Sequence, residues 1–286
     1  MLELVSGKWS GYYQLMRVNK PIGMLLLLWP TLWALWCAAS GMPPWPILAI
    51  FIAGGTIMRS AGCVINDVAD RDFDGYVQRT QFRPLVRGNV SLLEAWVLFI
   101  VLSVFAFISV WYLNTLTIGL GLVGLTVTII YPFMKRITDW PQLVLGIAFA
   151  WGVPMSYAAL DGEIPIAAAV LFVITYCWVV AYDTIYAMVD RDDDIKIGVR
   201  STAVRLGKND VKFVLTLQTI VLLGLLFFAI WQNFGLLFYP AWFIGALLMW
   251  YQARLIKDRN PADCFKAFLN NHWFGCVIFI GIAMSI

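Results

Sequence analysis

The stretch PILAIFIAGGTIMRSAGCVINDVADRDFD, residues 46–74, decides how the rest of this sequence is interpreted. Its first part, up to about residue 64, is apolar over the roughly 17–25 residues that a helix needs to cross a bilayer. Its second part is polar and acidic, with Asn66, Asp67, Asp70, Asp72 and Asp74 within nine residues. The stretch therefore predicts a membrane-spanning helix that ends in a cluster of carboxylates.

Apolar runs of similar length recur from residue 22 to the C-terminus. Of the 286 residues 61% are hydrophobic and only 13% are charged, about half the charged share of an average soluble protein. Because a helix satisfies its own backbone hydrogen bonds in lipid, we expect an all-α, polytopic membrane protein that forms a single domain over residues 1–286. About nine transmembrane helices are expected, at 22–40, 44–64, 91–112, 115–132, 141–160, 164–184, 212–232, 237–252 and 268–285.

The basic residues indicate how this bundle is oriented. All 20 lysines and arginines fall in the N-terminal segment or in, or beside, alternate connections between the expected helices. The remaining connections, around 41–43, 113–114, 161–163 and 233–236, contain none. The positive-inside rule then places the N-terminus in the cytoplasm and the C-terminus outside, which agrees with an odd number of helices.

The motif Asp-Arg-Asp-x-Asp occurs twice, at 70–74 and at 190–194, each time after a long apolar helix at a cytoplasmic exit. Such a match indicates an internal repeat, with the first four and the next four helices as related halves and one last helix. We therefore expect two equivalent acidic sites that face each other.

Helical spacing separates the predicted ligands in these motifs from their neighbours. Asn66, Asp70 and Asp74 are four residues apart, so they share one face if the helix continues beyond the membrane. Like charges at this spacing repel each other, and a bound cation would offset the repulsion. Oxygen ligands suit Mg²⁺, which is usually bound by one or two carboxylates together with the phosphates of a substrate. The predicted metal ligands are Asn66, Asp70, Asp74, Asp190 and Asp194, with Asp183 and Tyr186 on the same face as the last two. The roles of Asp72, Asp192 and Asp193 stay open.

Basic residues near these clusters suit a diphosphate, because preorganised cations stabilise the charge that develops on a leaving diphosphate. The candidates are Lys135, Arg136, Arg79, Arg83, Lys196 and Arg200, although membrane topology alone would also place basic residues there. Arg59 differs, because it lies inside an apolar helix, two turns deeper than Asn66 on the same face. It either snorkels to the interface or pairs with a carboxylate on a second substrate.

These motifs resemble those of the UbiA superfamily of intramembrane aromatic prenyltransferases. The resemblance covers nearly the whole chain and rests on the following stretches: Asn66-Asp67-x-x-Asp70-x-x-x-Asp74, Asp190-x-x-x-Asp194, Tyr131-Pro-Phe-Met-Lys135, Lys20-Pro-Ile-Gly23, Arg83-Pro-Leu85, the run 182–194, Ile197-Gly198 and Ser201-Thr202. It is greatest for the branch that prenylates 4-hydroxybenzoate in bacterial ubiquinone biosynthesis.

That resemblance implies helices around a central cavity in the bacterial inner membrane, with Mg²⁺ as cofactor. It implies transfer of a polyprenyl chain from polyprenyl diphosphate to the ring carbon ortho to the hydroxyl of 4-hydroxybenzoate. Membrane lipid is expected as a further partner, and nucleic acid is not. Catalytic roles are then expected for Asp70, Asp74, Asp190, Asp194, Lys135 and Arg136. Substrate binding is expected for Arg59, Asn66, Asp67, Arg79, Arg83, Tyr131, Asp183, Tyr186, Lys196 and Arg200.

Two alternatives remain at this point. One is a prenyltransferase of the same superfamily with another acceptor, of the haem, menaquinone, chlorophyll or tocopherol type. The other is a cation or metal transporter, although transporters usually place ionisable groups near the bilayer midplane on interrupted helices, whereas here the acids gather at one rim.

Overall fold

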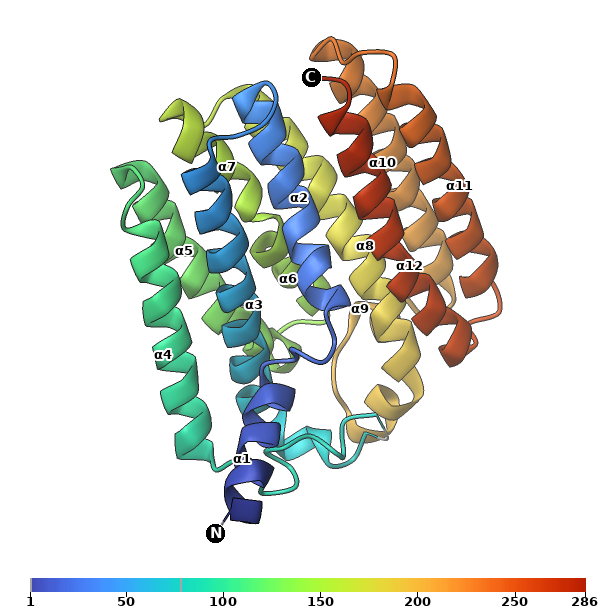
Figure 1. Ribbon diagram of the computed structural model, residues 1–286. Coiled ribbons are helices and arrows are strands. Elements are labelled where there is room, and N and C mark those ends of the chain that lie inside the picture. The colour runs from blue at the N-terminus through green and yellow to red at the C-terminus, as the bar shows by residue number, and fades with distance from the viewer. Residues whose placement is uncertain (1, 78) are drawn as a thin grey trace.

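The computed structural model describes residues 2–77 and 79–286, and over this part of the chain the regular structure is entirely helical (Figure 1). The elements are α1 (Leu2–Leu15), α2 (Ile22–Ala39), α3 (Trp45–Asp74), α4 (Leu92–Val110), α5 (Thr115–Ile130), the 3₁₀ helix η1 (Tyr131–Arg136), α6 (Pro141–Ala150), α7 (Gly152–Asp161), α8 (Ile166–Ile197), α9 (Thr202–Leu206), the 3₁₀ turn η2 (Gly207–Asn209), α10 (Asp210–Trp231), α11 (Phe238–Ile256) and α12 (Pro261–Ala283).

The long helices run side by side in one bundle, with the N-terminus at one end and the C-terminus at the other (Figure 1). Within the described residues, seven helical segments are long and apolar enough to cross a membrane: 22–39, 45–72, 92–110, 115–136, 141–161, 166–197 and 202–231. The helices α11 and α12, of 19 and 23 residues, run along the same bundle. The expectation of an all-α, multi-pass membrane protein with about nine helices is therefore confirmed.

Local sequence explains where several helices begin. Ser91 and Glu94 form a capping box at the start of α4, where the Ser91 hydroxyl accepts from the Glu94 N–H at 3.2 Å and the Glu94 carboxylate accepts from the Ser91 N–H at 2.8 Å. Asn114 caps α5 and Asn260 caps α12 in the same way, through their side-chain oxygens. Each cap supplies a partner for backbone N–H groups that the first turn of a helix leaves unpaired.

The helices α3 and α8 are longer than the sequence predicted. We expected them to end near 64 and 184, but they continue to Asp74 and Ile197. The expected bounds took the end of the apolar run as the end of the helix, whereas the continuation of α3, on which the shared face of Asn66, Asp70 and Asp74 depended, is confirmed. An apolar run marks the extent of the lipid, whereas a helix continues beyond it as long as its side chains find partners. This extension places both acidic motifs, 70–74 and 190–194, on the continuous helices α3 and α8.

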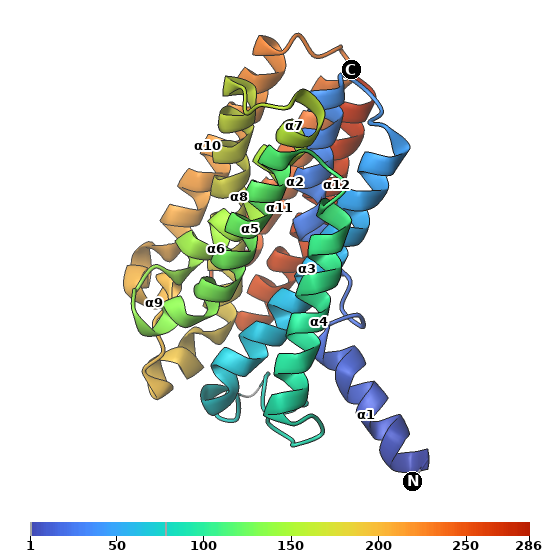
Figure 2. The same cartoon turned by 90° about the vertical axis from the view of Figure 1, so that its left-hand side faces the viewer.

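Two further differences concern α1 and the expected helix at 141–160. The helix α1 was not predicted, and it projects from the N-terminal end of the bundle (Figure 2). The expected helix is divided into α6 and α7 at Trp151. Next to this break, Gly152 lies against α2, where an added Cβ would be only 2.1 Å from the hydroxyl of Thr31. Only glycine allows α2 and α7 to approach this closely.

The core of the bundle lies between α2, α8 and α12. The indole rings of Trp33 and Trp178 stack with their centroids 5.0 Å apart, and the Trp178 N–H donates to Asn271 on α12 at 2.9 Å. A polar ladder joins the neighbouring helices, in which the Gln252 amide accepts from Gln218 at 2.8 Å and donates to Asn270 at 2.9 Å. These bonds satisfy polar groups that would otherwise be unpaired inside the membrane.

The first and the last long helices, α2 and α12, also pack directly against each other. The Trp29 indole N–H donates to His272 Nδ1 at 3.1 Å, and the Trp33 N–H donates to the Gly275 carbonyl at 3.0 Å. Trp36 packs edge-on against Phe279, with the ring centroids 4.9 Å apart. We call this contact the α2/α12 seam.

Candidate active site

The two acidic motifs meet at the end of the bundle that carries the N-terminus. One cavity, which we call the mouth cavity, is lined by carboxylates from the ends of α3 and α8 and by basic side chains from η1 and the loops after α3 and α8. Its charged lining consists of Asp70, Asp74, Arg79, Arg83, Lys135, Arg136, Asp190, Asp194 and Arg200. The structure thus brings together nine residues that the sequence analysis singled out.

Most acidic side chains of the mouth cavity are paired with a cation. Lys135 Nζ lies 2.7 Å from Asp70 Oδ2. Arg79 binds Asp190 with two hydrogen bonds, of 3.0 and 2.6 Å. Such pairing is required because a buried charge without a partner is strongly destabilising. The first pair joins η1 to α3, and the second joins the loop after α3 to α8. The ion pairs therefore also hold together the elements that line the cavity.

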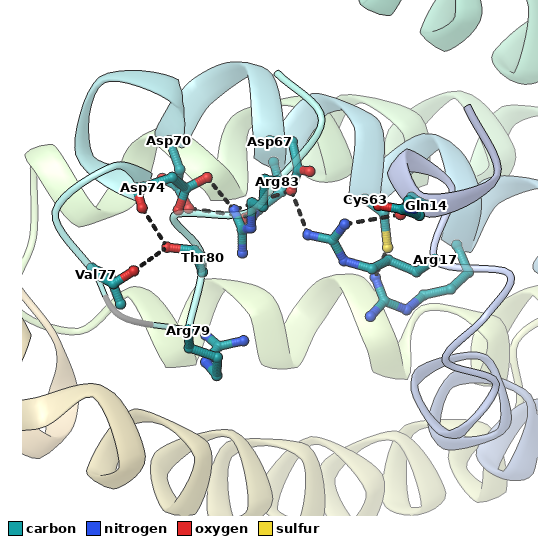
Figure 3. Close-up of polar contacts among 12 residues, drawn as sticks. Gln14, Arg17, Cys63, Asp67, Asp70, Asp74, Val77, Arg79, Thr80 and Arg83 are labelled. Atoms are coloured by element: carbon teal, nitrogen blue, oxygen red, sulfur yellow. Dashed lines mark hydrogen bonds and ion pairs between the residues drawn. The ribbon is translucent and has the colours of Figure 1, made fainter. Parts of the chain in front are cut away.

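Arg83 lies between the two carboxylates Asp67 and Asp74 and forms an ion pair with each (Figure 3). Thr80 holds the preceding turn of the loop, because its hydroxyl donates to the Asp74 carbonyl at 2.9 Å. Asp74 lies beyond the membrane-spanning part of α3, and its carboxyl is nevertheless buried. Burial raises the pKa of Asp74 to about 6, against the opposing effect of Arg83.

A chain of hydrogen bonds leads from the mouth cavity into the bundle. Asp70 Oδ2, which accepts from Lys135, also accepts from the Asn66 amide at 3.2 Å, and Asn66 Oδ1 accepts from the Tyr131 hydroxyl at 3.1 Å. Tyr131 and Lys135 belong to the 3₁₀ helix η1. This short turn places the lysine in the mouth cavity and the tyrosine at a second cavity deeper in the membrane.

The second cavity is apolar and extends among α2, α3, α4, α5, α6 and α7. Arg59 lies at its edge, where its Nε donates to the Gly23 carbonyl at 3.1 Å and its Nη1 donates to Cys63 Sγ at 2.8 Å. The guanidinium also lies over the Phe149 ring, 5.3 Å from its centroid. An added Cβ at Gly23 would be 2.6 Å from Arg59 Nη2, so a larger residue there would require the end of the arginine side chain to shift. Within the described part of the chain, no carboxylate forms an ion pair with Arg59.

The donor set fits a divalent cation together with a diphosphate better than a cation alone. Among the described residues, no group of three or more His, Cys, Asp or Glu side chains is arranged as a complete metal site. Mg²⁺ does not need one, because it is usually held by one or two carboxylates plus phosphate oxygens and water. The carboxylates of Asp70, Asp74, Asp190 and Asp194 line one cavity together with cations that could bind a diphosphate.

Several of the predicted residues do not line the mouth cavity. Asp67 is buried behind it, and Lys196 is exposed and pairs with Asp193 at 3.3 Å. Tyr186 packs beneath the Arg79 guanidinium, whose carbon is 4.6 Å from the ring centroid. Asp183 lies two turns further into the membrane on α8, as its spacing from Asp190 dictates. These residues surround the site without contacting the mouth cavity.

Sequence reasoning missed three supporting residues. Arg17 pairs with Asp67 at 2.8 Å, Thr80 bonds to the end of α3, and Phe149 lies under Arg59. Neither Thr80 nor Phe149 belongs to a recognisable pattern. Arg17 was counted only as a topology signal, and an acidic partner 50 residues away has no signature in a single sequence.

In this membrane bundle two acidic helix ends and interleaved cations face one cavity, and a second, apolar cavity lies deeper in the bundle. This is the architecture of an intramembrane prenyltransferase. The chain belongs to the UbiA prenyltransferase family, whose model matches residues 27–275. It is 49% identical to a 4-hydroxybenzoate octaprenyltransferase of Tolumonas auensis, with 100% of both chains covered. It is 50% identical to the protein of that name from Klebsiella pneumoniae, over 99% of this chain and 98% of the relative.

Solved structures agree with this assignment. The apo structure of a UbiA homolog from Aeropyrum pernix K1 matches with a TM-score of 0.80 at 25% identity, over 94% of this chain and 98% of that one. A UbiA homolog from Archaeoglobus fulgidus, solved with GPP and Mg²⁺, shares the fold at a TM-score of 0.71 and 18% identity, over 96% of this chain and 99% of that one. Family membership decides for the prenyltransferase over the cation transporter.

Proposed function

We propose that this chain transfers a polyprenyl group from a polyprenyl diphosphate to the ring carbon ortho to the hydroxyl of 4-hydroxybenzoate. The full-length relatives of about 50% identity carry the name 4-hydroxybenzoate octaprenyltransferase. The structural observation that carries the proposal is Arg59, a cation inside the membrane at the edge of an apolar cavity. Its partners are a carbonyl, a thiol and an aromatic ring, and the carboxylate of an aromatic acid would supply the missing counter-charge.

The mouth cavity would hold the diphosphate of the donor. Asp70, Asp74, Asp190 and Asp194, with Asn66 behind them, would hold Mg²⁺, which stabilises the negative charge on the departing diphosphate. The cations that now pair with these carboxylates, above all Arg79, Arg83 and Lys135, would turn to the diphosphate oxygens. Arg136 and Arg200 line the same cavity and add to its positive charge. Donor binding is thus an exchange of ion pairs, in which each carboxylate and each cation keeps a partner.

Charge and geometry then favour attack by the acceptor ring. As the C–O bond of the donor breaks, positive charge develops on its allylic carbon, which the ring faces of Tyr131 and Phe149 at the apolar cavity can stabilise. Arg59 would hold the acceptor carboxylate at the inner side, with the ring towards the mouth cavity. The new C–C bond forms at the ring carbon beside the hydroxyl, and the proton of that carbon passes to a base at the site.

The apolar cavity is the place for the prenyl tail. Small residues line it on several helices, among them Gly54 and Gly62 of α3 and Gly121 and Gly124 of α5. At Gly62 and Gly121 an added Cβ would have no contact closer than 3.5 Å, which would leave room for a flexible hydrocarbon chain, whereas Gly54 and Gly124 allow Ser109 and Trp151 to approach closely. The tail would run from the diphosphate past Tyr131 into this space.

We further propose that the mouth cavity faces the cytoplasm and that the enzyme resides in the bacterial inner membrane. The mouth cavity lies at the N-terminal end of the bundle, and the C-terminus lies at the other end (Figure 1). The connections at the N-terminal end contain the basic residues, which the positive-inside rule assigns to the cytoplasm.

A reconstituted assay tests the proposal. Purified protein with Mg²⁺, octaprenyl diphosphate and labelled 4-hydroxybenzoate should yield an ortho-prenylated acid, and the absence of product with every donor length would overturn the function. The variant Arg59→Gln should raise the KM for 4-hydroxybenzoate by about 10- to 100-fold while diphosphate affinity is kept. Arg254→Gln, at an arginine that packs over Trp250 on α11, is the matched control. Unchanged acceptor affinity in Arg59→Gln would disprove the carboxylate assignment.

A further inference from the structure

Asp67 belongs to the first acidic motif but does not line the mouth cavity. Its carboxylate is 1% exposed, and its Oδ1 lies 2.8 Å from Arg17 Nη2 and 3.1 Å from Arg83 Nη1. Its second oxygen, Oδ2, has no hydrogen-bond partner among the described residues. Figure 3 shows Asp67 between the two guanidiniums, with Arg83 on the side of Asp74. A carboxylate in this position cannot reach a ligand in the cavity except through Arg83.

Arg83 is the link between Asp67 and the cavity. Its side chain is 12% exposed, lines the mouth cavity and pairs with Asp74 on the cavity side and Asp67 on the other. If Asp74 held a metal ion, Arg83 would lose one of these two partners. Asp67 then remains as the group that holds the guanidinium in place.

Arg17 brings the N-terminal segment to the same carboxylate. Its backbone is in the left-handed region, with a φ of 56°, which is unfavourable for a residue with a side chain. The guanidinium also donates to the Gln14 carbonyl at 3.0 Å. The preceding helix α1 is fixed separately, because Lys8 and Tyr12 both donate to Glu94 of α4, at 2.6 and 3.1 Å. The turn at Arg17 is therefore built to deliver its side chain to Asp67.

Several cations gather around Asp67. Arg17 and Arg83 both pair with it, Arg83 pairs with Asp74 as well, and Lys20 is close enough for Arg17, Arg79 and Arg83 to act on it. Burial and these three arginines lower the pKa of Lys20. A cluster of like charges spreads apart unless a counter-ion holds it.

We infer that Asp67 is a positioning residue that orients Arg83 towards the donor diphosphate from behind and joins the N-terminal turn to the same point. This inference rests on the proposed function, since it takes diphosphate as the ligand of the mouth cavity. It replaces the direct contact of Asp67 with substrate that the motif alone suggested.

Charge and position make opposite predictions for Asp67→Asn. The substitution removes a negative charge near an anion site, so electrostatics alone would tighten diphosphate binding. If Asp67 positions Arg83, the same substitution frees the guanidinium and weakens binding despite the gain in net positive charge. The sign of the change therefore distinguishes a positioning residue from a background charge.

The experiment measures inorganic diphosphate binding to the full-length protein in detergent, by calorimetry with saturating Mg²⁺. Asp67→Asn should raise the Kd at least about tenfold, as expected for loss of one charge-assisted hydrogen bond. Asp72→Asn is the matched control, because Asp72 is on the same helix but is exposed and pairs with its neighbour Arg71. That variant should stay within about twofold of the parent. Equal or tighter binding by Asp67→Asn would overturn the inference.

Two further measurements keep the result decisive. Asp67→Glu retains the charge but moves the carboxylate by one methylene, so it should also weaken diphosphate binding. Parent-like binding by this variant would refute the positioning role of Asp67 even if Asp67→Asn fails to fold. The KM for 4-hydroxybenzoate should not change in either variant, whereas a general structural defect would alter both substrates. If the parent protein itself binds no diphosphate, the proposed function fails rather than the role of Asp67.

Discussion

Replacing Arg79 by glutamine should increase the affinity of the free protein for Mg²⁺. In the structure Arg79 occupies both carboxylate oxygens of Asp190 through bonds of 3.0 and 2.6 Å. A metal ion that binds Asp190, as proposed, would have to displace this guanidinium first. Without Arg79 the carboxylate is available at once, and the repulsion between the cation and the metal is also removed.

The magnitude follows from the exposure of the pair. Hydrogen bonds between charged groups contribute about 1.5–3 kcal/mol each when they are buried. The side chains here are 31% and 18% exposed, so solvent screening reduces the cost of displacement to about 1–2 kcal/mol. The Kd for Mg²⁺ alone should then fall about 5- to 30-fold. The affinity for diphosphate should fall, because one of its cations is missing.

Calorimetric titrations of Mg²⁺ without diphosphate, and of diphosphate at fixed Mg²⁺, measure the two effects separately. Lys196→Gln is the control, since Lys196 is 70% exposed and pairs with Asp193 rather than with a cavity carboxylate. Weaker Mg²⁺ binding by Arg79→Gln would refute the exchange of ion pairs. It would mean that the arginine supports the metal site instead of competing with it.

Three further predictions concern the tail, the metal and the bundle. Gly121→Phe should reduce kcat/KM for octaprenyl diphosphate about tenfold or more and leave kcat/KM for dimethylallyl diphosphate unaffected, because the new ring fills the apolar cavity. The lipid-facing Leu122→Phe should change kcat/KM for neither donor, and equal losses for both donors in Gly121→Phe would contradict the prediction. The Asp74 carboxyl must lose its proton to bind a metal ion, and its pKa is about 6, so Mg²⁺ affinity should rise between about pH 5 and 7. A profile already flat above pH 5 would argue against Asp74 as a metal ligand. Gln252→Leu should lower the midpoint of thermal unfolding in detergent, since loss of its bonds to α10 and α12 costs about 1–2 kcal/mol, and an unchanged midpoint would show that these bonds are dispensable.

The general fold and the members of the candidate site could be predicted because they depend on strong local patterns. Apolar runs identified the membrane helices, and the spacing of Asp70 and Asp74 on α3, and of Asp190 and Asp194 on α8, identified one face of each. The mouth cavity contains all four. Their role as metal ligands stays a prediction.

The pairing inside the site could not be predicted in this way. Asp67 has the same residue type as Asp70 and lies only three positions away, yet it faces two arginines that are 50 and 16 positions distant along the chain. Such contacts depend on how the loop after α3 and the N-terminal turn fold back, and neither has a periodic sequence. The contact between Arg59 and Gly23 also has no signal before the helices are packed.

The α2/α12 seam has a consequence for how the protein is made. Trp29 and His272 are separated by 243 positions, and Trp33 and Gly275 by 242, so the first long helix waits for nearly the whole chain to be synthesised before it meets its partner. During membrane insertion the face of α2 that carries Trp29 and Trp36 therefore lacks its partners on α12, whereas Trp33 can stack on Trp178 as soon as α8 is in place. The seam forms only when the last helix enters, and a chain that stops before residue 261 lacks it entirely.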